Sequence, residues 1–139
     1  MQSTDDLAQQ FRHAGFKITP QRLSVFDALH ACADHPTAEQ VYQRVIQTLP
    51  SVSMRTVYQT LNDLVAMGEL RALRRADEAT RFDLRNDHHH HALCDDCNSV
   101  IDVDAHDIDL STFAIGDAGF NASRADVIIR GRCSACAAA

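Results

Sequence analysis

Two pairs of cysteines constrain this chain more than any other feature of its sequence. Cys94 and Cys97 form the first CxxC pair, and Cys133 and Cys136 form the second after 35 intervening residues. One CxxC turn presents two thiolates to an ion, and two such turns complete the tetrahedral four-thiolate shell of structural zinc. A redox dithiol is the alternative, but it uses one CxxC beside a βαβ pattern, which is absent here. The spacing therefore predicts a closed Zn²⁺ site that ties the chain's end to the start of its second domain.

Charge is distributed unevenly along the chain. Residues 1–86 carry ten Lys or Arg and ten Asp or Glu, whereas residues 87–139 carry three and nine. The net charge of −6 therefore comes from the second half. The first half can still present a basic face to phosphates, and the acidic second half suits divalent cations.

The sequence does not predict a membrane span or a secretory signal. No apolar run approaches the roughly 20 residues that cross a bilayer, and residues 1–10 lack the basic and apolar regions of a signal peptide. We therefore expect a cytoplasmic protein with no membrane partner. In that reducing compartment, paired cysteines are typically metal ligands, and the remaining Cys32 is interpreted as a small core residue.

Apolar residues recur at helical spacing in four successive segments of the first half. The segments are residues 7–11, 23–29, 41–49 and 57–65. Thr19 before Pro20, Thr37 and Ser53 are expected N-caps, and Gly68 marks the end of the last helix.

A hairpin is predicted after these helices. Residues 70–75 and 80–84 have strand character, with a turn through Asp77 and Glu78. Helices followed by a two-stranded wing indicate a winged helix-turn-helix, with residues 53–67 as the recognition helix. We predict a DNA-binding domain at residues 1–84, because its polar and aromatic groups can contact phosphates and base edges. The expected DNA contacts are Lys17, Arg22, Arg55, Thr56, Tyr58 and Gln59.

The second half, residues 85–139, is predicted to be a small α+β domain, which makes the whole chain α+β. Strand-like runs occur at residues 92–93, 100–103 and 127–129, with a weak helix near residues 108–113.

Four consecutive histidines, residues 88–91, precede the first CxxC pair. On a strand, His89 and His91 share one face and can reach one cation, while His88 and His90 point away. Imidazoles with nearby carboxylates suit Fe, Mn, Zn, Ni or Co. The run predicts a second metal site beside the cysteines.

The motifs together closely resemble the ferric uptake regulator family over nearly the whole chain. They are residues 15–22 (GFKITPQR), 35–38 (HPTA), 53–61 and 81–83 (RFD), the histidine run and both CxxC pairs. The resemblance implies a transcriptional repressor rather than an enzyme. It also implies a homodimer with C-terminal dimerisation domains, which binds palindromic operators in double-stranded DNA when a regulatory metal occupies the hinge.

The resemblance further implies the ligands of the regulatory metal. The matching positions are His35, Asp83, His89, His91 and Asp102. Aspartates at positions 83 and 102 resemble the peroxide-sensing branch, whereas iron sensors usually have glutamates there and zinc sensors often add a cysteine. We therefore expect Fe²⁺ or Mn²⁺ in this site, with peroxide oxidising His35 or His89. Iron-responsive and zinc-responsive repressors of the same family are the alternatives.

The sequence also departs from the family pattern. Many members have an auxiliary metal site, matched here by His88, His90 and an acid near Asp109, but Arg124 occupies the region that supplies its last histidine. Gln59 replaces a basic residue that often follows the recognition-helix tyrosine. The sequence leaves open whether an auxiliary site exists, and the operator preference of the family does not transfer to this chain.

Two other classes of function agree with only parts of the sequence. A zinc hydrolase or deaminase needs an open coordination position and a general base, and the chain contains no HExxH or HxE motif. An interaction module with purely structural zinc would leave the histidines idle, and it predicts no effect of replacing His89 or His91.

Overall fold

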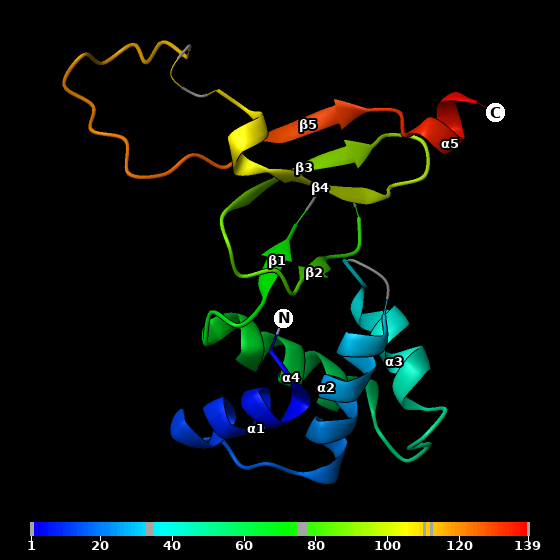
Figure 1. The fold of residues 1–139 in the computed structure, drawn as a ribbon. Helices are drawn as coiled ribbons and strands as arrows, with labels where there is room; N and C mark the ends of the chain where they lie inside the picture. Colours follow the sequence, from blue (N-terminus) through cyan, green and yellow to red (C-terminus); the bar gives the residue numbers. More distant parts are fainter. Residues whose placement is uncertain (1, 33–34, 75–77, 110, 112, 139) are drawn as a thin grey trace. The chain divides into compact units, whose positions relative to one another are not determined.

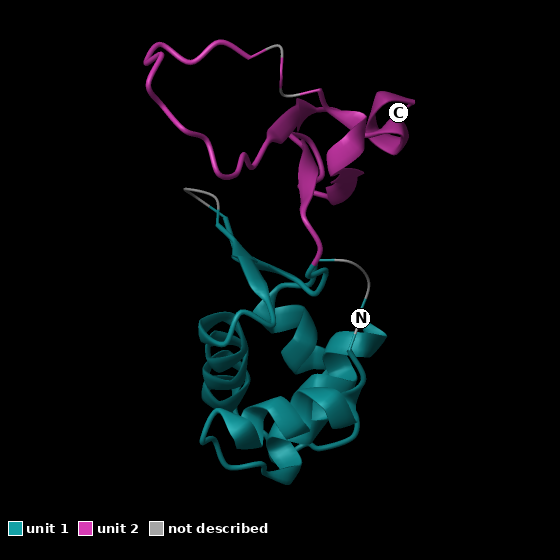
Figure 2. Ribbon diagram, turned by 60° about the vertical axis from the view of Figure 1, so that its left-hand side comes forward, with its two compact units in different colours: residues 1–86 teal, residues 87–139 magenta. Residues whose placement is uncertain are grey.

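The chain folds as two units, residues 1–86 and 87–139, which Figure 2 shows in different colours. The computed structural model describes residues 2–32, 35–74, 78–109, 111 and 113–138. None of the helices in those ranges has the length and apolar character needed to cross a membrane.

Unit 1, residues 1–86, consists of four helices and a hairpin (Figure 1). Its elements are α1 (Thr4–His13), α2 (Pro20–Ala31), α3 (Ala38–Val45), α4 (Met54–Ala66), β1 (Arg71–Leu73) and β2 (Arg81–Asp83). The strands β1 and β2 pair antiparallel. This order confirms the predicted winged helix-turn-helix, with α4 in the position of the recognition helix.

The helices of unit 1 begin where the sequence places their caps. The side chains of Thr19, Thr37 and Ser53 each accept a hydrogen bond from the backbone N–H three residues later. Gly68 directly follows Met67, the C-cap residue of α4. Its φ of +79° is a left-handed conformation that glycine adopts without steric cost. The capping box of α1 at Ser3 was not predicted.

One apolar cluster forms the core of unit 1. Sixteen buried side chains contribute to it, drawn from all four helices and from the segments around them. Helix α4 inserts Val57, Leu61 and Leu64, while Leu70 and Phe82 attach the hairpin. Because these α4 side chains recur at helical spacing, the opposite face of α4 is left for solvent or a partner.

Unit 2, residues 87–139, contains a three-stranded sheet. Its elements are β3 (His89–Cys94), β4 (Val100–Asp104), η1 (Ala105–Asp107), β5 (Ile128–Gly131) and α5 (Ser134–Ala137). The strand order is β4-β3-β5, with β3 antiparallel to β4 and parallel to β5. The predicted α+β fold is confirmed.

Two details of the prediction fall on residues that the structure does not describe. The weak helix expected near residues 108–113 includes Leu110 and Thr112, and the expected hairpin turn includes Asp77, all outside the described residues. The structure has a short 3-10 helix, η1, directly after β4.

Candidate metal centres and nucleic-acid interface

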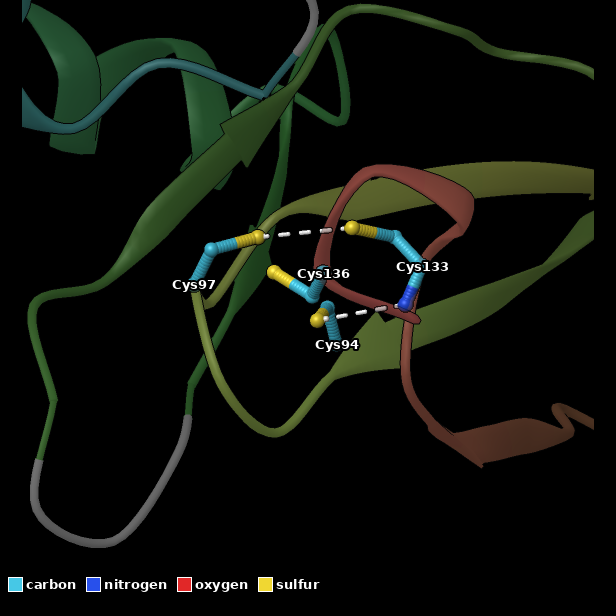
Figure 3. A group of neighbouring side chains, drawn as sticks. All are labelled: Cys94, Cys97, Cys133 and Cys136. Carbon is cyan, nitrogen blue, oxygen red and sulfur yellow. Dashed lines mark hydrogen bonds between the residues drawn. The ribbon is translucent and has the colours of Figure 1, made fainter. Parts of the chain in front are cut away.

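The four paired cysteines meet at one end of the unit 2 sheet (Figure 3). Their Sγ atoms all lie within 4.8 Å of one another, and the sulfurs of Cys97 and Cys133 are 3.7 Å apart. A tetrahedral zinc ion with Zn–S bonds of about 2.3 Å holds its sulfurs about 3.8 Å apart. The cluster therefore has the donor set and the spacing of structural zinc.

Electrostatics within the cluster also favour a cation. Backbone N–H groups of Cys133 and Cys97 donate to the sulfur of Cys94 and lower the pKa of that thiol to about 6. Hydrogen bonds with the sulfurs of Cys133, Cys97 and Cys94 favour the protonated Cys136 thiol and raise its pKa to about 12. A divalent ion at the centre would replace that proton and let all four groups bind as thiolates.

Contacts around the cysteines hold the two CxxC turns in register. The backbone N–H of Asp95 donates to the carbonyl of Gly131 at 2.8 Å. The two residues between the first pair of cysteines each form an ion pair with an arginine beside the second pair. Asp95 lies 2.6 Å from Arg130, and Asp96 lies 2.6 Å from Arg132. Strand β5 is thus fastened to the first turn by backbone and side chain together.

A second group of possible ligands lies on β3 and β4 of unit 2. The carboxylate of Asp102 is 3.3 Å from Nε2 of His89 and 3.8 Å from Nε2 of His91. The two imidazole rings are 4.6 Å apart, and both side chains are buried. Nδ1 of His89 lies 2.9 Å from the carbonyl of Asp87, which requires its proton there and leaves the lone pair of the neutral ring on Nε2. That arrangement suits Nε2 for metal binding.

Unit 1 contains a smaller group of possible ligands, one histidine and one aspartate. Nε2 of His35 is 3.8 Å from the Asp83 carboxylate, and both side chains are buried. The segment that carries His35 is attached to β2, because the backbone N–H of Phe82 donates to the carbonyl of Pro36 and the Arg81 guanidinium donates to the carbonyl of His35. His35 has a φ of +57°, in the left-handed region that is uncommon for residues other than glycine.

The other face of the histidine strand makes different contacts. Nε2 of His88 lies 2.9 Å from the carbonyl of Ala125, and Nδ1 of His90 accepts a hydrogen bond from the backbone N–H of Val127. Both histidines therefore contact the segment that enters β5. Neither they nor Asp109 belong to a group of three or more potential metal ligands within the described ranges.

Four of the six predicted DNA contacts lie on α4. Arg55, Tyr58 and Gln59 are exposed on this helix, Thr56 is half-buried there, and Lys17 is exposed just before α2. Arg55, Thr56 and Gln59 line a pocket between the N-terminal ends of α2 and α4, and Arg22 lines the same pocket.

Arg22, another predicted contact, is half-buried, and several contacts within unit 1 hold its side chain. Its guanidinium lies 2.8 Å from the Asp63 carboxylate and donates to the carbonyl of Lys17. It also stacks over the rings of Phe11 and Phe16, at 5.0 and 5.6 Å from their centroids. These contacts give Arg22 a place between α1, α2 and α4.

Two acidic residues that the sequence reasoning missed contact the predicted reading side chains. The Tyr58 hydroxyl donates to Glu39 at 2.6 Å, which lowers the pKa of the Glu39 carboxyl and raises the pKa of Tyr58. The Gln59 amide nitrogen lies 3.4 Å from Asp63. Asp63 follows Gln59 by four residues, a spacing that could have suggested their contact, whereas nothing local connects Glu39 to Tyr58.

Comparison with known proteins identifies the family. The profile of the ferric uptake regulator family matches residues 13–130. The chain belongs to this family. Among its relatives, the peroxide-responsive repressor PerR of Staphylococcus saprophyticus is 30% identical over 133 residues, which cover 95% of this chain and 90% of that protein. PerR of Staphylococcus aureus strain Mu50 is 34% identical over 91 residues, which cover 66% of this chain and 62% of that protein.

Solved structures share the fold of this ferric uptake regulator family member. The regulator of Pseudomonas aeruginosa, solved with manganese, matches with a TM-score of 0.70 and 26% identity over 91% of this chain and 96% of that one. PerR from Streptococcus pyogenes, studied for peroxide sensing and gene regulation, matches with a TM-score of 0.54 and 25% identity over 98% and 94%. The Helicobacter pylori regulator, with three functional metal-binding sites, matches with a TM-score of 0.74 at 20% identity over 96% and 90%.

Proposed function

We propose that this chain is a metal-dependent, DNA-binding transcriptional repressor that responds to peroxide. The observation that carries the proposal is the 30% identity to a peroxide-responsive repressor along 95% of the chain. The buried clusters of histidine and aspartate agree with it, because Fe²⁺ and Mn²⁺ prefer imidazole and carboxylate donors. The thiols form a separate cluster suited to structural Zn²⁺.

The regulatory ion would join two half-sites. The His35–Asp83 pair belongs to unit 1, and His89, His91 and Asp102 belong to unit 2. Each half-site offers too few donors to fill the coordination shell of Fe²⁺ or Mn²⁺, so we infer that one ion draws on both. An ion bound in this way favours one arrangement of the two units, and DNA that binds the same arrangement becomes coupled to the metal.

We propose different roles for the two units. Residues 1–84 form the winged-helix domain that contacts double-stranded DNA with the outer face of α4, and residues 85–139 form the dimerisation and metal-binding domain. Exposed apolar side chains on β4 and β5 support the second role, with Ile101, Ile128 and Ile129 each 44% or more exposed. A two-fold homodimer fits a palindromic operator, since symmetric reading heads need symmetric half-sites.

Peroxide sensing would act through the histidine ligands. Bound Fe²⁺ supplies the electrons that start the reduction of hydrogen peroxide. The family resemblance points to His35 or His89 as the ligand that would be oxidised: one oxygen atom of hydrogen peroxide would be inserted into a ring C–H bond, and the other would leave as water. The oxidised ring is a poorer ligand, so the half-sites separate and the operator is released. This role is regulatory, and we propose no enzymatic turnover.

The decisive test compares metals and oxidant. The purified full chain is titrated with duplexes selected from a randomised pool, using fluorescence anisotropy under anaerobic conditions. We expect binding with Mn²⁺ or Fe²⁺, and loss of binding after peroxide treatment of the Fe²⁺ form alone. Mass spectrometry should then find one added oxygen on a peptide that contains His35 or His89. Metal-dependent binding by an Fe²⁺ form indifferent to peroxide would identify an iron-responsive repressor instead, and a response confined to Zn²⁺ would identify a zinc-responsive one.

A further inference from the structure

The side chain of Gln59 is oriented by an acidic neighbour on its own helix. Its Nε2 atom lies 3.4 Å from Oδ1 of Asp63, one turn further along α4. An ionised carboxylate only accepts hydrogen bonds, so it requires the NH₂ group of the Gln59 amide to face it. The carbonyl oxygen of Gln59 is left on the side away from Asp63, and Gln59 is exposed.

Asp63 is itself held in place by Arg22. Its other oxygen, Oδ2, accepts a charge-assisted hydrogen bond from the Arg22 guanidinium at 2.8 Å, while its side chain is largely buried. Arg22 is in turn fixed by stacking on Phe11 and Phe16. Because Oδ2 is committed to Arg22, Oδ1 remains directed at Gln59.

This arrangement has a consequence for base readout. In the major groove, adenine N6 and cytosine N4 are donors, whereas guanine O6 and N7 and thymine O4 are acceptors. A glutamine that rotates its amide freely can satisfy either kind of edge. A glutamine whose NH₂ group faces a carboxylate uses one of its two N–H groups in that contact and turns its oxygen to the other side, where the oxygen favours bases with an amino group.

We propose that Asp63 is a specificity-determining positioning residue, which fixes Gln59 as a hydrogen-bond acceptor and so selects adenine or cytosine at one position of each half-site. The proposal rests on the proposed function, in which α4 reads the operator. Arg22 belongs to the same arrangement and acts on Gln59 through Asp63.

The test selects sequences from a pool of randomised DNA duplexes with the Mn²⁺-loaded full chain. Asp63→Asn preserves volume but lets the amide of residue 63 donate or accept, so Gln59 is released. We expect this variant to lose about tenfold of its discrimination at one position per half-site. Asp5→Asn, at an exposed position in the first turn of α1, makes the same change in net charge and should retain the wild-type preference.

A second pair of variants distinguishes the proposed role of Asp63 from a role in stability alone. In Gln59→Ala, Asp63→Asn should cause no further loss of discrimination, because the side chain it orients is gone. Gln59→Glu alters an exposed position and presents only acceptors, so it should keep the preference for adenine or cytosine even if Asp63→Asn folds poorly.

Three results overturn the inference while leaving DNA binding intact. They are an unchanged preference in a folded Asp63→Asn variant, a loss that persists in the Gln59→Ala background, and loss of the adenine or cytosine preference in Gln59→Glu. If the wild-type chain enriches no sequence with Mn²⁺, the proposed function itself fails, and this inference fails with it.

Discussion

Unit 1 buries sixteen apolar side chains in one cluster, whereas the described part of unit 2 buries only Leu93 and Cys94 among its apolar residues. The other buried side chains of unit 2 are the consecutive histidines His89, His90 and His91. Burial of apolar surface is the main driving force for folding, and it suffices for a domain with the core of unit 1. In unit 2, much of the space that a core would fill contains metal-binding atoms.

The two kinds of metal-binding group in unit 2 differ in what they can complete alone. All four cysteines belong to unit 2, so an ion bound by them stabilises this unit by itself. Asp102 and its two histidines form only part of a coordination shell. A complete set of ligands within one unit supports the folding of that unit. An incomplete set binds an ion firmly only when further ligands join it, so it is suited to a regulatory role.

Removal of one cysteine should have the largest effect. Cys97→Ser takes away one of four thiolates, and structural zinc contributes on the order of 10 kcal/mol to small domains of this kind. We expect zinc to be lost and amide protection in unit 2 to collapse, while the helices of unit 1 stay protected. Zinc content and hydrogen exchange by mass spectrometry measure both.

Cys32→Ser is the matched control for this change. Cys32 is a half-buried cysteine of unit 1, outside the cluster. Its replacement should leave one zinc ion per chain. A Cys97→Ser variant with full zinc and a protected sheet would show that unit 2 does not depend on the sulfur cluster.

A cavity in the core of unit 1 should destabilise unit 1 and leave unit 2 folded. Phe26→Ala removes a fully buried ring that packs edge-to-face on Phe11, and we expect a loss of about 3–5 kcal/mol in the free energy of unfolding of unit 1. Zinc should remain bound. Asp27→Ala, exposed on the same helix, should change stability by about 1 kcal/mol or less. Zinc loss in Phe26→Ala would mean that the two units fold as one.

Replacement of a histidine should affect the link between units rather than either fold. His89→Ala is expected to lower Mn²⁺ affinity about 100-fold or more and to abolish metal-dependent DNA binding, with zinc unchanged. His88→Ala, on the other face of the strand, is the control and should retain both. Calorimetric titration with Mn²⁺ compares them, and equal affinities for the two variants would contradict the assignment of the half-site.

The cap of the recognition helix offers a smaller change within unit 1. Ser53→Ala removes the hydroxyl that accepts from the backbone N–H of Thr56, which should lower the stability of unit 1 by about 1 kcal/mol. Denaturant unfolding followed by helical circular dichroism measures this loss. Ser53→Asp should restore most of it, and a neutral Ser53→Ala would show that the cap is dispensable.

The smallest predicted effect concerns pH. The Tyr58 hydroxyl lowers the pKa of Glu39 from its usual 4.5, so this contact stabilises unit 1 above pH 4.5 and the stabilisation is lost as pH falls through the lowered pKa. Tyr58→Phe should return the Glu39 pKa towards 4.5. Carboxyl titration by NMR checks the shift, and an unchanged pKa would show that the hydroxyl is not its cause.

Features that depend on neighbouring residues were predictable from the sequence. The caps Thr19, Thr37 and Ser53 were correct because a cap contacts a backbone group only three residues away. The four-cysteine cluster was also predictable, since two CxxC turns supply the four thiolates of a closed zinc shell.

Features that depend on tertiary contacts were not predictable from the sequence. The contact of Arg22 with Asp63 joins residues that are 41 positions apart in the sequence, and only packing of α2 on α4 brings them together. The parallel pairing of β3 with β5 joins strands separated by a long connection with no strong pattern. His35 and Asp83 were paired only through resemblance, because their proximity comes from the attachment of the His35 segment to β2.

The left-handed backbone at His35 bears on how this chain responds to laboratory evolution. An L-residue there costs about 1 kcal/mol relative to glycine. The His35 side chain is only 3% exposed, so His35→Gly would also leave a cavity, which costs about 2–5 kcal/mol in a packed core. Selection for heat resistance alone would therefore retain a side chain at this position despite the strain.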